Sequence, residues 1–203
     1  MCCRFYTDDE TKKDILGMVR KYDRKIDWLR EGDVAPSDPA TVITGEEPGL
    51  YARDMRWGFP SVKAGELLIN ARVETVREKK SFSGSVDQGR CVIPAKGFYE
   101  WDRDRHKATL TDPEGRMLYL AGLYKEFEDG ARFTVLTTKA NSSMQPIHDR
   151  MPLLLEKEEV TGWLENGDRT DAYLAAVPGE LSAYREYEQL SLFDLQQIRT
   201  EKR

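Results

Sequence analysis

Short apolar runs, separated by charged and turn-forming residues, are the feature that most limits the fold of this chain. Apolar runs of a few residues with such boundaries are typical of β-strands, whereas helices of globular proteins need longer periodic segments. No run approaches the ~20 consecutive apolar residues that a membrane-spanning helix requires. The strands that these runs predict cover residues 3–6, 41–44, 67–69, 90–95, 97–101, 108–111, 117–123 and 133–138.

Two segments instead predict helices. In the first, apolar residues recur every three or four positions; Thr7 or Asp8 can cap its start, and Gly32 can end it. Its apolar positions are Ile15, Val19, Tyr22, Ile26 and Leu29. The second helix, over residues 158–166, is short. Between the apolar runs 108–111 and 117–123, the turn sequence Asp-Pro-Glu-Gly predicts that the two runs form a hairpin.

Composition places the chain among globular proteins. Of its 203 residues, 39% are hydrophobic and 33% are charged, which fits one domain with a sizeable core. The start of the chain lacks the apolar segment of a secretory signal. Three cysteines, two of them adjacent, argue against a disulfide framework and favour a reducing compartment. We therefore expect a cytoplasmic protein.

Charge is distributed unevenly along the chain, whose net charge is -5. Residues 51–107 carry twelve Lys or Arg against eight Asp or Glu, whereas residues 156–203 carry six against eleven. A basic middle between acidic flanks fits a limited phosphate-contacting groove better than a protein that coats duplex DNA. A solvated charged surface is the alternative explanation.

The chain starts with Met1-Cys2-Cys3-Arg4, and a small second residue favours removal of the initiator methionine. Cys2 would then carry an α-amine and a thiol on one residue. The amine of such a 1,2-aminothiol condenses with an aldehyde to an imine, and the thiol then closes a five-membered thiazolidine. Ordinary pKa values of ~8 for the amine and ~8.5 for the thiol give both a reactive fraction at neutral pH. The alternative is that Cys2 is only an early residue of the first strand.

Three further polar residues occupy positions suited to a site. Asn70 follows an apolar strand that would hold it rigidly. Glu100 lies between two aromatic residues of a strand, where a buried carboxyl group can act as a general acid or base; alternation could instead place it on the exposed face. His148 and Arg150 could combine a proton shuttle with a phosphate ligand. A histidine that only hydrogen-bonds the backbone is the alternative.

Trp57 is followed by Gly58 in a basic segment that also contains Arg53 and Arg56. An aromatic ring in such a segment can be a stacking platform for a nucleic-acid base. A tryptophan buried in the core explains the same sequence, so both interpretations stay open at this stage.

Taken together, these segments resemble the SOS response-associated peptidase (SRAP) family, which senses abasic sites in single-stranded DNA. The resemblance spans residues 1 to about 155, and six motifs in one order are more specific than any single motif. The motifs are MCCRF at 1–5, VAP at 34–36, WG at 57–58, NARVET at 70–75, IPAKGFYEW at 93–101 and IHDRMP at 147–152.

The resemblance implies a single α+β domain over residues 1–185, with a largely antiparallel, barrel-like β core and flanking helices. It also implies covalent capture of an abasic site, whose ring-opened form presents an aldehyde, as a thiazolidine on Cys2. Glu100 would relay protons, and the same groups could slowly reverse the crosslink. His148 would assist sugar-ring opening, and Asn70 would hold the terminal amine or the sugar. The peptidase of the family name would be self-processing of the N-terminus.

A set of DNA-binding residues follows from the same resemblance. The arginines would hold phosphates on either side of the lesion, while the proline and tryptophan would pack against exposed bases. The set is Arg4, Pro36, Trp57, Arg72, Arg77, Thr138 and Arg150. The chain departs from the family at Cys3, where glycine is usual, so an extra side chain occupies space that the lesion must approach.

Residues 186–203 would form a tail outside the domain. The pentapeptide QLSLF within it is similar to the motif by which bacterial replication and repair proteins bind the sliding clamp. Such motifs place a few apolar anchors in a preformed groove. A terminal amphipathic helix packed on the domain is the alternative. The residues concerned are Gln189, Leu190, Leu192 and Phe193.

Three other functions fit parts of the pattern. A cysteine peptidase acting in trans would use Cys2 and His148 without needing a free amine. Asn70 or Glu100 would then orient the histidine. A metal site of Cys2, Cys3 and His148 lacks the two-residue spacing typical of structural zinc, and an adaptor that only binds DNA or the clamp would leave no covalent product. We expect lesion capture by a monomer associated with the nucleoid, without a metal or cofactor.

Overall fold

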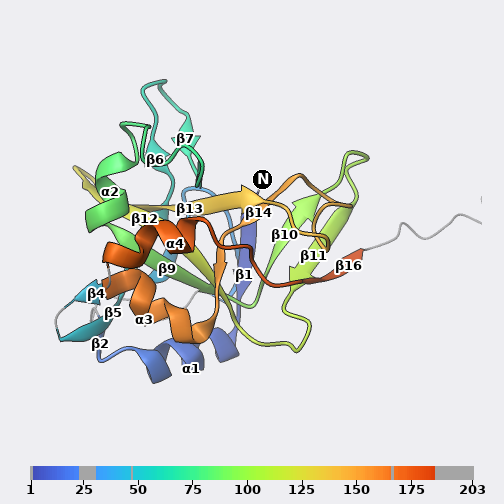
Figure 1. The fold of residues 1–203 in the computed structure, drawn as a ribbon, viewed down its shortest axis with the longest axis horizontal. Helices are drawn as coiled ribbons and strands as arrows, with labels where there is room; N and C mark the ends of the chain where they lie inside the picture. The colour runs from blue at the N-terminus through green and yellow to red at the C-terminus, as the bar shows by residue number, and fades with distance from the viewer. Residues whose placement is uncertain (1, 23–30, 47, 166, 186–203) are drawn as a thin grey trace, which may run out of the picture.

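A closed five-stranded barrel forms the centre of the molecule (Figure 1). The computed structural model describes residues 2–22, 31–46, 48–165 and 167–185. Neighbouring barrel strands pair in antiparallel fashion except where β13 meets β5, and this parallel pair closes the barrel. In spatial order the barrel strands are β13 (Gly130–Lys139), β12 (Leu118–Phe127), β9 (Arg90–Ala95), β4 (Pro39–Glu46) and β5 (Gly49–Trp57).

A second, five-stranded antiparallel sheet lies beside the barrel. It holds the first strand of the chain at its interior, between β10 and β3 (Figure 1). Its order is β16 (Ser182–Arg185), β11 (Lys107–Thr111), β10 (Gly97–Trp101), β1 (Arg4–Thr7) and β3 (Gly32–Val34). The predicted α+β class with a barrel-like, largely antiparallel core is therefore confirmed.

Short strands extend the barrel at its edges. β8 runs parallel to β13, while β14 and β15 pair antiparallel with β13 and β12. β2 pairs with β5, and β6 and β7 form a separate hairpin. Their bounds are β2 (Lys21–Tyr22), β6 (Phe59–Pro60), β7 (Leu67–Leu68), β8 (Asn70–Arg72), β14 (Arg150–Pro152) and β15 (Leu154–Leu155).

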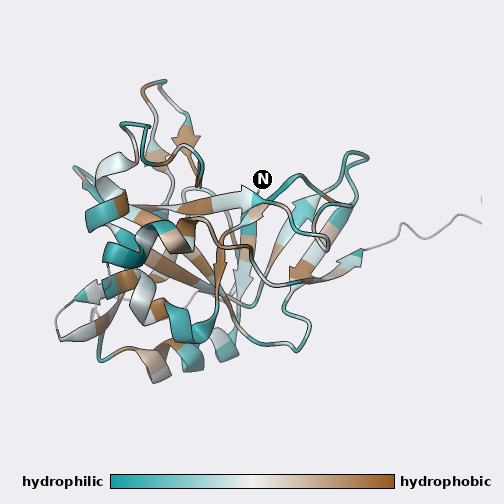
Figure 2. Ribbon diagram, in the orientation of Figure 1, coloured by the Kyte–Doolittle hydropathy of each residue, from teal (hydrophilic) through white to brown (hydrophobic). Residues whose placement is uncertain are grey.

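Among the described residues, four short α-helices lie outside the barrel, and the central strands are rich in apolar residues (Figure 2). In the described part of the chain, no helix is long and apolar enough to cross a membrane. The helices are α1 (Asp9–Met18), α2 (Ser83–Gln88), α3 (Val160–Glu165) and α4 (Thr170–Leu174), with 3-10 turns at Lys157–Glu159 and Gly167–Arg169.

Helix α1 begins as predicted but ends early. The Asp8 carboxylate accepts a hydrogen bond from the Thr11 amide at 2.9 Å and caps the helix. Val19 is already extended, and the Arg20 amide donates to the Leu50 carbonyl of β5. The prediction that one helix continues through Tyr22 is therefore wrong, because backbone pairing with β5 replaces it. Ile26 and Leu29 lie outside the described residues.

The predicted hairpin around residues 112–115 is also wrong. The turn itself is present, with a Gly115 amide to Asp112 carbonyl hydrogen bond and a φ of 74° at Gly115. Its two flanking strands, however, belong to different sheets: β11 pairs with β10 and β16, whereas β12 pairs with β9, β13 and β15. The turn thus connects the second sheet to the barrel.

Arg90, on β9, connects the barrel to two helices. It is 8% exposed, and its guanidinium donates to the carbonyls of Trp163 at 2.6 Å, Val86 at 3.0 Å and Asp87 at 2.9 Å. Burial lowers the pKa of Arg90. These carbonyls belong to α2 and α3, where the last turn of a helix leaves C=O groups without partners, so one side chain satisfies both helix ends.

Replacing Arg90 tests this connection. Arg90→Met leaves several buried carbonyls without donors, and each such group costs about 1–3 kcal/mol. We expect a loss of at least about 2 kcal/mol in the free energy of unfolding, measured by urea titration of tryptophan fluorescence. Arg56→Met, at an exposed position of β5, is the matched control and should change stability by less than about 0.5 kcal/mol. Equal stability of both variants would contradict the proposed role of Arg90.

A candidate active site at the start of the chain

Cys2 lies just before β1 and is only 1% exposed. Its carbonyl accepts a hydrogen bond from the Asn70 side-chain amide at 2.8 Å, and its thiol lies 3.9 Å from the Arg4 carbonyl. Asn70 is the first residue of β8, where pairing opposite Val135 of β13 fixes its backbone. The start of the second sheet is therefore tied to the edge of the barrel.

The other end of the Asn70 side chain has no partner among the described residues. Its Oδ1 atom is buried and accepts no hydrogen bond. A buried acceptor without a donor costs about 1–3 kcal/mol. An amine or hydroxyl group brought next to Cys2 would supply the missing donor, so Asn70 has one group that holds Cys2 and another available for a ligand.

Glu100 reaches the same place from β10, the neighbour of β1 in the second sheet. It is 4% exposed, so the expectation of a buried carboxyl group is confirmed and the exposed alternative is wrong. One carboxylate oxygen accepts from the Trp101 amide at 3.3 Å. Burial raises the thiol pKa of both Cys2 and Cys3, and the negative charge of the nearby Glu100 raises both further.

Burial raises the pKa of the Cys2 thiol far above its ordinary value, and the charge of Glu100 raises it further. The expectation of an ordinary thiol pKa near ~8.5 is therefore wrong. Burial of this position is set by packing across the second sheet and the barrel, which the first four letters of the sequence do not reveal. At neutral pH the thiol of Cys2 is protonated and needs a base before it can react.

His148 lies in the turn between β13 and β14, and its side chain is 28% exposed. Its Nδ1 atom is 3.0 Å from the Arg150 amide and 2.9 Å from an Asp149 carboxylate oxygen. Accepting from the amide requires an unprotonated Nδ1, whereas binding the carboxylate requires a protonated one. Met144 and Ile147 of this turn pack in the same hydrophobic cluster as Cys2.

Two of the predicted phosphate ligands present their guanidinium groups to solvent. Arg4 is exposed and forms an ion pair with Asp33 at 3.2 Å. Arg72, at the end of β8, is exposed, and no ion pair engages it within the described part of the chain. Both flank the site, since Arg4 is two residues from Cys2 and Arg72 is two residues from Asn70.

Arg150 is largely occupied inside the protein. It is 8% exposed and forms a bidentate pair with Glu74 at 2.6 and 2.9 Å. It also donates to the Thr137 carbonyl at 2.6 Å. This pairing lowers the pKa of Glu74. A phosphate contact for Arg150, and one for Thr138 on the neighbouring β13 position, stay predictions.

Of two other predicted contacts, one stays a prediction and one is corrected. Arg77 pairs with Asp171 at 2.6 Å and Asp87 at 3.0 Å and so links α4 to α2; its contact with a phosphate beside the lesion stays a prediction. Trp57 is 0% exposed and cannot pack against a base. Its ring centroid lies 5.2 Å from that of Phe5. Trp57 is therefore a residue of the hydrophobic core, which was the alternative explanation of the sequence.

The backbone of Trp57 nevertheless holds Pro36, a predicted DNA-binding residue, in place. The Trp57 carbonyl accepts from the Ser37 amide at 2.9 Å, and its amide donates to the Asp38 carbonyl at 3.0 Å. These bonds hold the turn that contains the half-exposed Pro36. Neither this backbone pairing nor the pairing of Glu74 with Arg150 can be predicted from sequence spacing, because the partners lie far apart along the chain.

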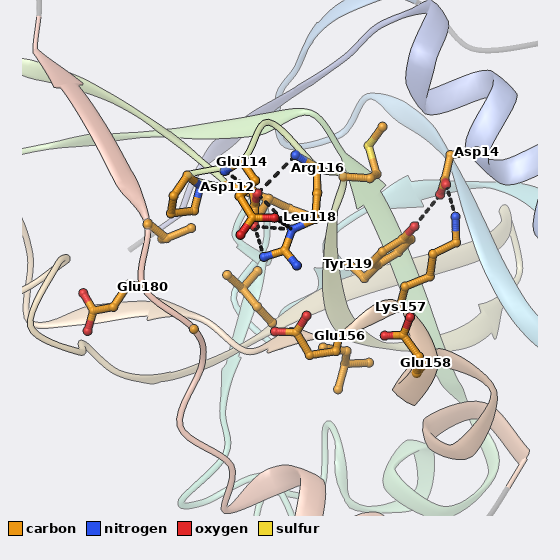
Figure 3. A pocket seen from close by; sticks show the side chains of 16 residues that line it. Asp14, Asp112, Glu114, Arg116, Leu118, Tyr119, Glu156, Lys157, Glu158 and Glu180 are labelled. Carbon is orange, nitrogen blue, oxygen red and sulfur yellow. Dashed lines mark hydrogen bonds and ion pairs between the residues drawn. The ribbon is translucent and has the colours of Figure 1, made fainter.

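A cavity of about 550 Å³ lies away from these residues, between α1, the turn after β11 and the segment after β15 (Figure 3). Tyr119 donates to Asp14 at 2.6 Å on one side of it, and Arg116 pairs with Asp112 on the other. An excess of carboxylates repels phosphate, so this cavity does not suit nucleic acid. The acidic residues in its lining are Asp14, Asp112, Glu114, Glu156, Glu158 and Glu180.

The ligand set considered for a metal is not formed. Among the described residues, the group close enough to share an ion is Asp102, Asp104 and His106, in the turn between β10 and β11. Cys2, Cys3 and His148 are not such a group. One oxygen of Asp102 already accepts the amides of Asp104 and His106, so the turn explains this cluster without a metal.

The chain matches the model of a known protein family. The family model described as SOS response associated peptidase (SRAP) matches residues 1–193. A match over nearly the whole chain shows that the chain belongs to the SRAP family.

Curated relatives and solved structures are similar over most of the chain. The chain is 34% identical over 170 residues to the abasic site processing protein YoqW of Bacillus subtilis, covering 74% of this chain and 76% of that protein. It is 27% identical over 177 residues to the abasic site processing protein YedK of Escherichia coli, with coverages of 81% and 79%. A Bordetella bronchiseptica protein of solved structure shares the fold, with a TM-score of 0.75, 22% identity and coverages of 92% and 100%.

The electrostatic coupling of Glu100 and Cys2 is testable by alkylation. Glu100→Gln removes a negative charge that raises the Cys2 pKa, so the thiolate fraction at a given pH rises. We expect faster reaction with iodoacetamide by up to about tenfold, the change that corresponds to one pH unit in pKa. The rate is measured by mass spectrometry of the N-terminal peptide in a Cys3→Ser background. Glu114→Gln, an exposed carboxylate on a turn, is the control, and an unchanged rate in Glu100→Gln would contradict the coupling.

Proposed function

We propose that this protein captures abasic sites in single-stranded DNA as a thiazolidine on Cys2, after removal of Met1. The observation that carries the proposal is the placement of Cys2 at the chain start beside Glu100, with Asn70 bound to its carbonyl. Relatives that bear the name abasic site processing protein support the same substrate. Capture would protect the lesion from strand cleavage and from error-prone copying.

The proposed reaction balances without a cofactor. The α-amine of Cys2 attacks the aldehyde carbon of the ring-opened sugar, and loss of one water gives an imine. The sulfur then bonds to the imine carbon, and the thiol proton ends on the nitrogen. Because the thiol pKa is raised, this second step needs a base close to the sulfur. Glu100 serves as that base, taking the proton from sulfur and returning it to nitrogen.

The surrounding residues have supporting roles in this proposal. Asn70 orients the Cys2 backbone through Nδ2, and its buried Oδ1 accepts a hydrogen bond from the new terminal amine. His148 assists opening of the sugar ring. Arg72 and Arg4, both exposed, bind phosphates on either side of the lesion, where charge-assisted contacts to phosphate are strong.

A cysteine peptidase acting in trans and a non-covalent adaptor are the rival functions. Both predict that the α-amine of Cys2 is dispensable, because neither forms an imine. The proposed reaction requires the amine and the thiol on the same residue. Clamp binding through Gln189, Leu190, Leu192 and Phe193 is a separate proposal from the sequence, since these residues lie outside the described part of the chain.

Crosslinking on a denaturing gel tests the proposal. Processed protein mixed with single-stranded DNA that carries one abasic site should give a slow-migrating band, and an undamaged strand should not. Cys2→Ala removes the thiol, while a Gly inserted between Met1 and Cys2 keeps the thiol but moves the amine to another residue. Both variants should lose the band, with mass spectrometry confirming each N-terminus. A band of equal strength from the Gly-inserted protein would contradict thiazolidine formation.

The rate of capture distinguishes the role of Glu100 as a proton acceptor from the effect of its negative charge on the thiol. Glu100→Gln makes the thiol more acidic yet removes the proton acceptor, so we expect crosslinking to slow by about 100-fold, within the range for general acid–base catalysis. The rate is followed by quenched time points on the same gel, with Glu114→Gln as the matched control. Faster crosslinking in Glu100→Gln, in line with faster alkylation, would show that Glu100 acts only through its charge.

A further inference from the structure

The outward face of the second sheet carries aromatic and basic side chains on adjacent strands. On β1, Arg4 and Tyr6 face outward while Phe5 is buried. On β10, Tyr99 and Trp101 are partly exposed while their neighbours point into the core. The alternation that buries Glu100 beside Cys2 therefore also turns two aromatic rings toward solvent on the opposite face of the same strand.

Strand register continues this surface across the sheet. Arg4 lies opposite Tyr99, and Trp101 lies opposite Lys107 of β11. Tyr184 on the last strand, β16, stands in line with Tyr99 through the shared neighbour Thr109. Strands are about 4.8 Å apart, so the row from β1 to β16 is about 14 Å wide. We call Arg4, Tyr6, Tyr99, Trp101, Lys107 and Tyr184 the aromatic face.

Two rings of the aromatic face, those of Tyr6 and Tyr99, stack on each other. The Tyr6 and Tyr99 ring centroids are 5.4 Å apart with planes at 22°. Tyr6 lies across Gly97, where an added Cβ would be 2.7 Å from its Cε1 atom, so a side chain there would displace the ring. Lys107 Nζ is 4.0 Å from the Tyr99 centroid. Tyr184, at 69% exposed, projects furthest into solvent.

The aromatic face adjoins the candidate active site at Arg4, which is exposed and two residues from Cys2. Glu100 and Cys2 are buried on the other side of the sheet, so a strand held at Cys2 would reach the face by passing Arg4. The acidic residue on the face, Asp33, is already engaged: it pairs with Arg4, and its hydrogen bond helps burial raise the pKa of Tyr99 to about 12. Tyr99 is therefore a neutral ring at physiological pH, and Arg4 and Lys107 leave the face without excess negative charge.

We propose that the aromatic face is a stacking platform for the bases of the single strand that flanks the captured lesion. This inference rests on the proposed function, because it needs a strand attached at Cys2. Aromatic rings on a sheet beside cationic groups bind single-stranded DNA in a sequence-tolerant way, since every base has a π-face. Bases inside a duplex do not expose that face, so the platform selects single strands.

Reversible binding tests the platform apart from the capture reaction. In a Cys2→Ala background, fluorescein-labelled oligothymidylates of 4, 8 and 16 nucleotides are titrated and followed by anisotropy. Base stacking is worth about 1–3 kcal/mol, so Tyr184→Ala and Tyr99→Leu should each weaken binding of the longest strand by about 5- to 100-fold. Tyr184→Phe, which keeps the ring, should restore binding. Tyr22→Ala, at a 48% exposed tyrosine on β2, is the matched control and should bind as the parent does.

Three outcomes overturn the platform. Parent-like binding in both Tyr184→Ala and Tyr99→Leu is one, and failure of Tyr184→Phe to restore binding is another. Equal weakening for a 16-base-pair duplex is the third, because it would indicate charge rather than stacking. The abasic-site gel with the wild-type protein reports separately on the proposed function: no crosslink there refutes capture, whereas the oligothymidylate titration decides the platform.

Discussion

The hydrogen bond from the Asn70 side chain to the Cys2 carbonyl is the contact on which the site depends. It joins the beginning of the second sheet to β8 at the barrel edge. The geometry of Cys2 is thereby set by the barrel, through the pairing of β8 with β13. The first residues of a chain tend to be poorly ordered unless tied down, and this bond holds them where a reactive terminus needs fixed orientation.

Glu100 has two opposing effects on the Cys2 thiol in the proposed reaction. In the resting protein burial and the charge of Glu100 both raise the thiol pKa and keep the sulfur protonated. During ring closure the same carboxylate becomes the proton acceptor, so the group that suppresses the thiolate also makes the thiol usable. Side chains of β10 alternate between the two faces of the second sheet. Glu100 therefore points to the candidate active site, while Tyr99 and Trp101 point to the aromatic face.

Apolar runs predicted the barrel strands β4, β9, β12 and β13 because such runs report burial directly, but they did not predict β5. The position of Glu100 between two aromatic residues left both a buried and an exposed carboxyl group open. Sequence patterns failed where the decisive partner lies far along the chain. Helix α1 ends at Met18 because Arg20 pairs with Leu50, and Trp57 is buried because its ring packs beside Phe5. Motif resemblance located Cys2 and its neighbours, but no spacing rule reveals which face of a sheet or which carboxylate a side chain will meet.

The buried, protonated state of Cys2 has a consequence for the durability of the protein. Oxidation of cysteine proceeds through the thiolate and requires access to solvent. A thiol with a raised pKa and 1% exposure is therefore slow to form sulfenic acid, even while oxidants that damage DNA are present. The cysteine that we propose to capture abasic sites is therefore protected from oxidation until DNA reaches it.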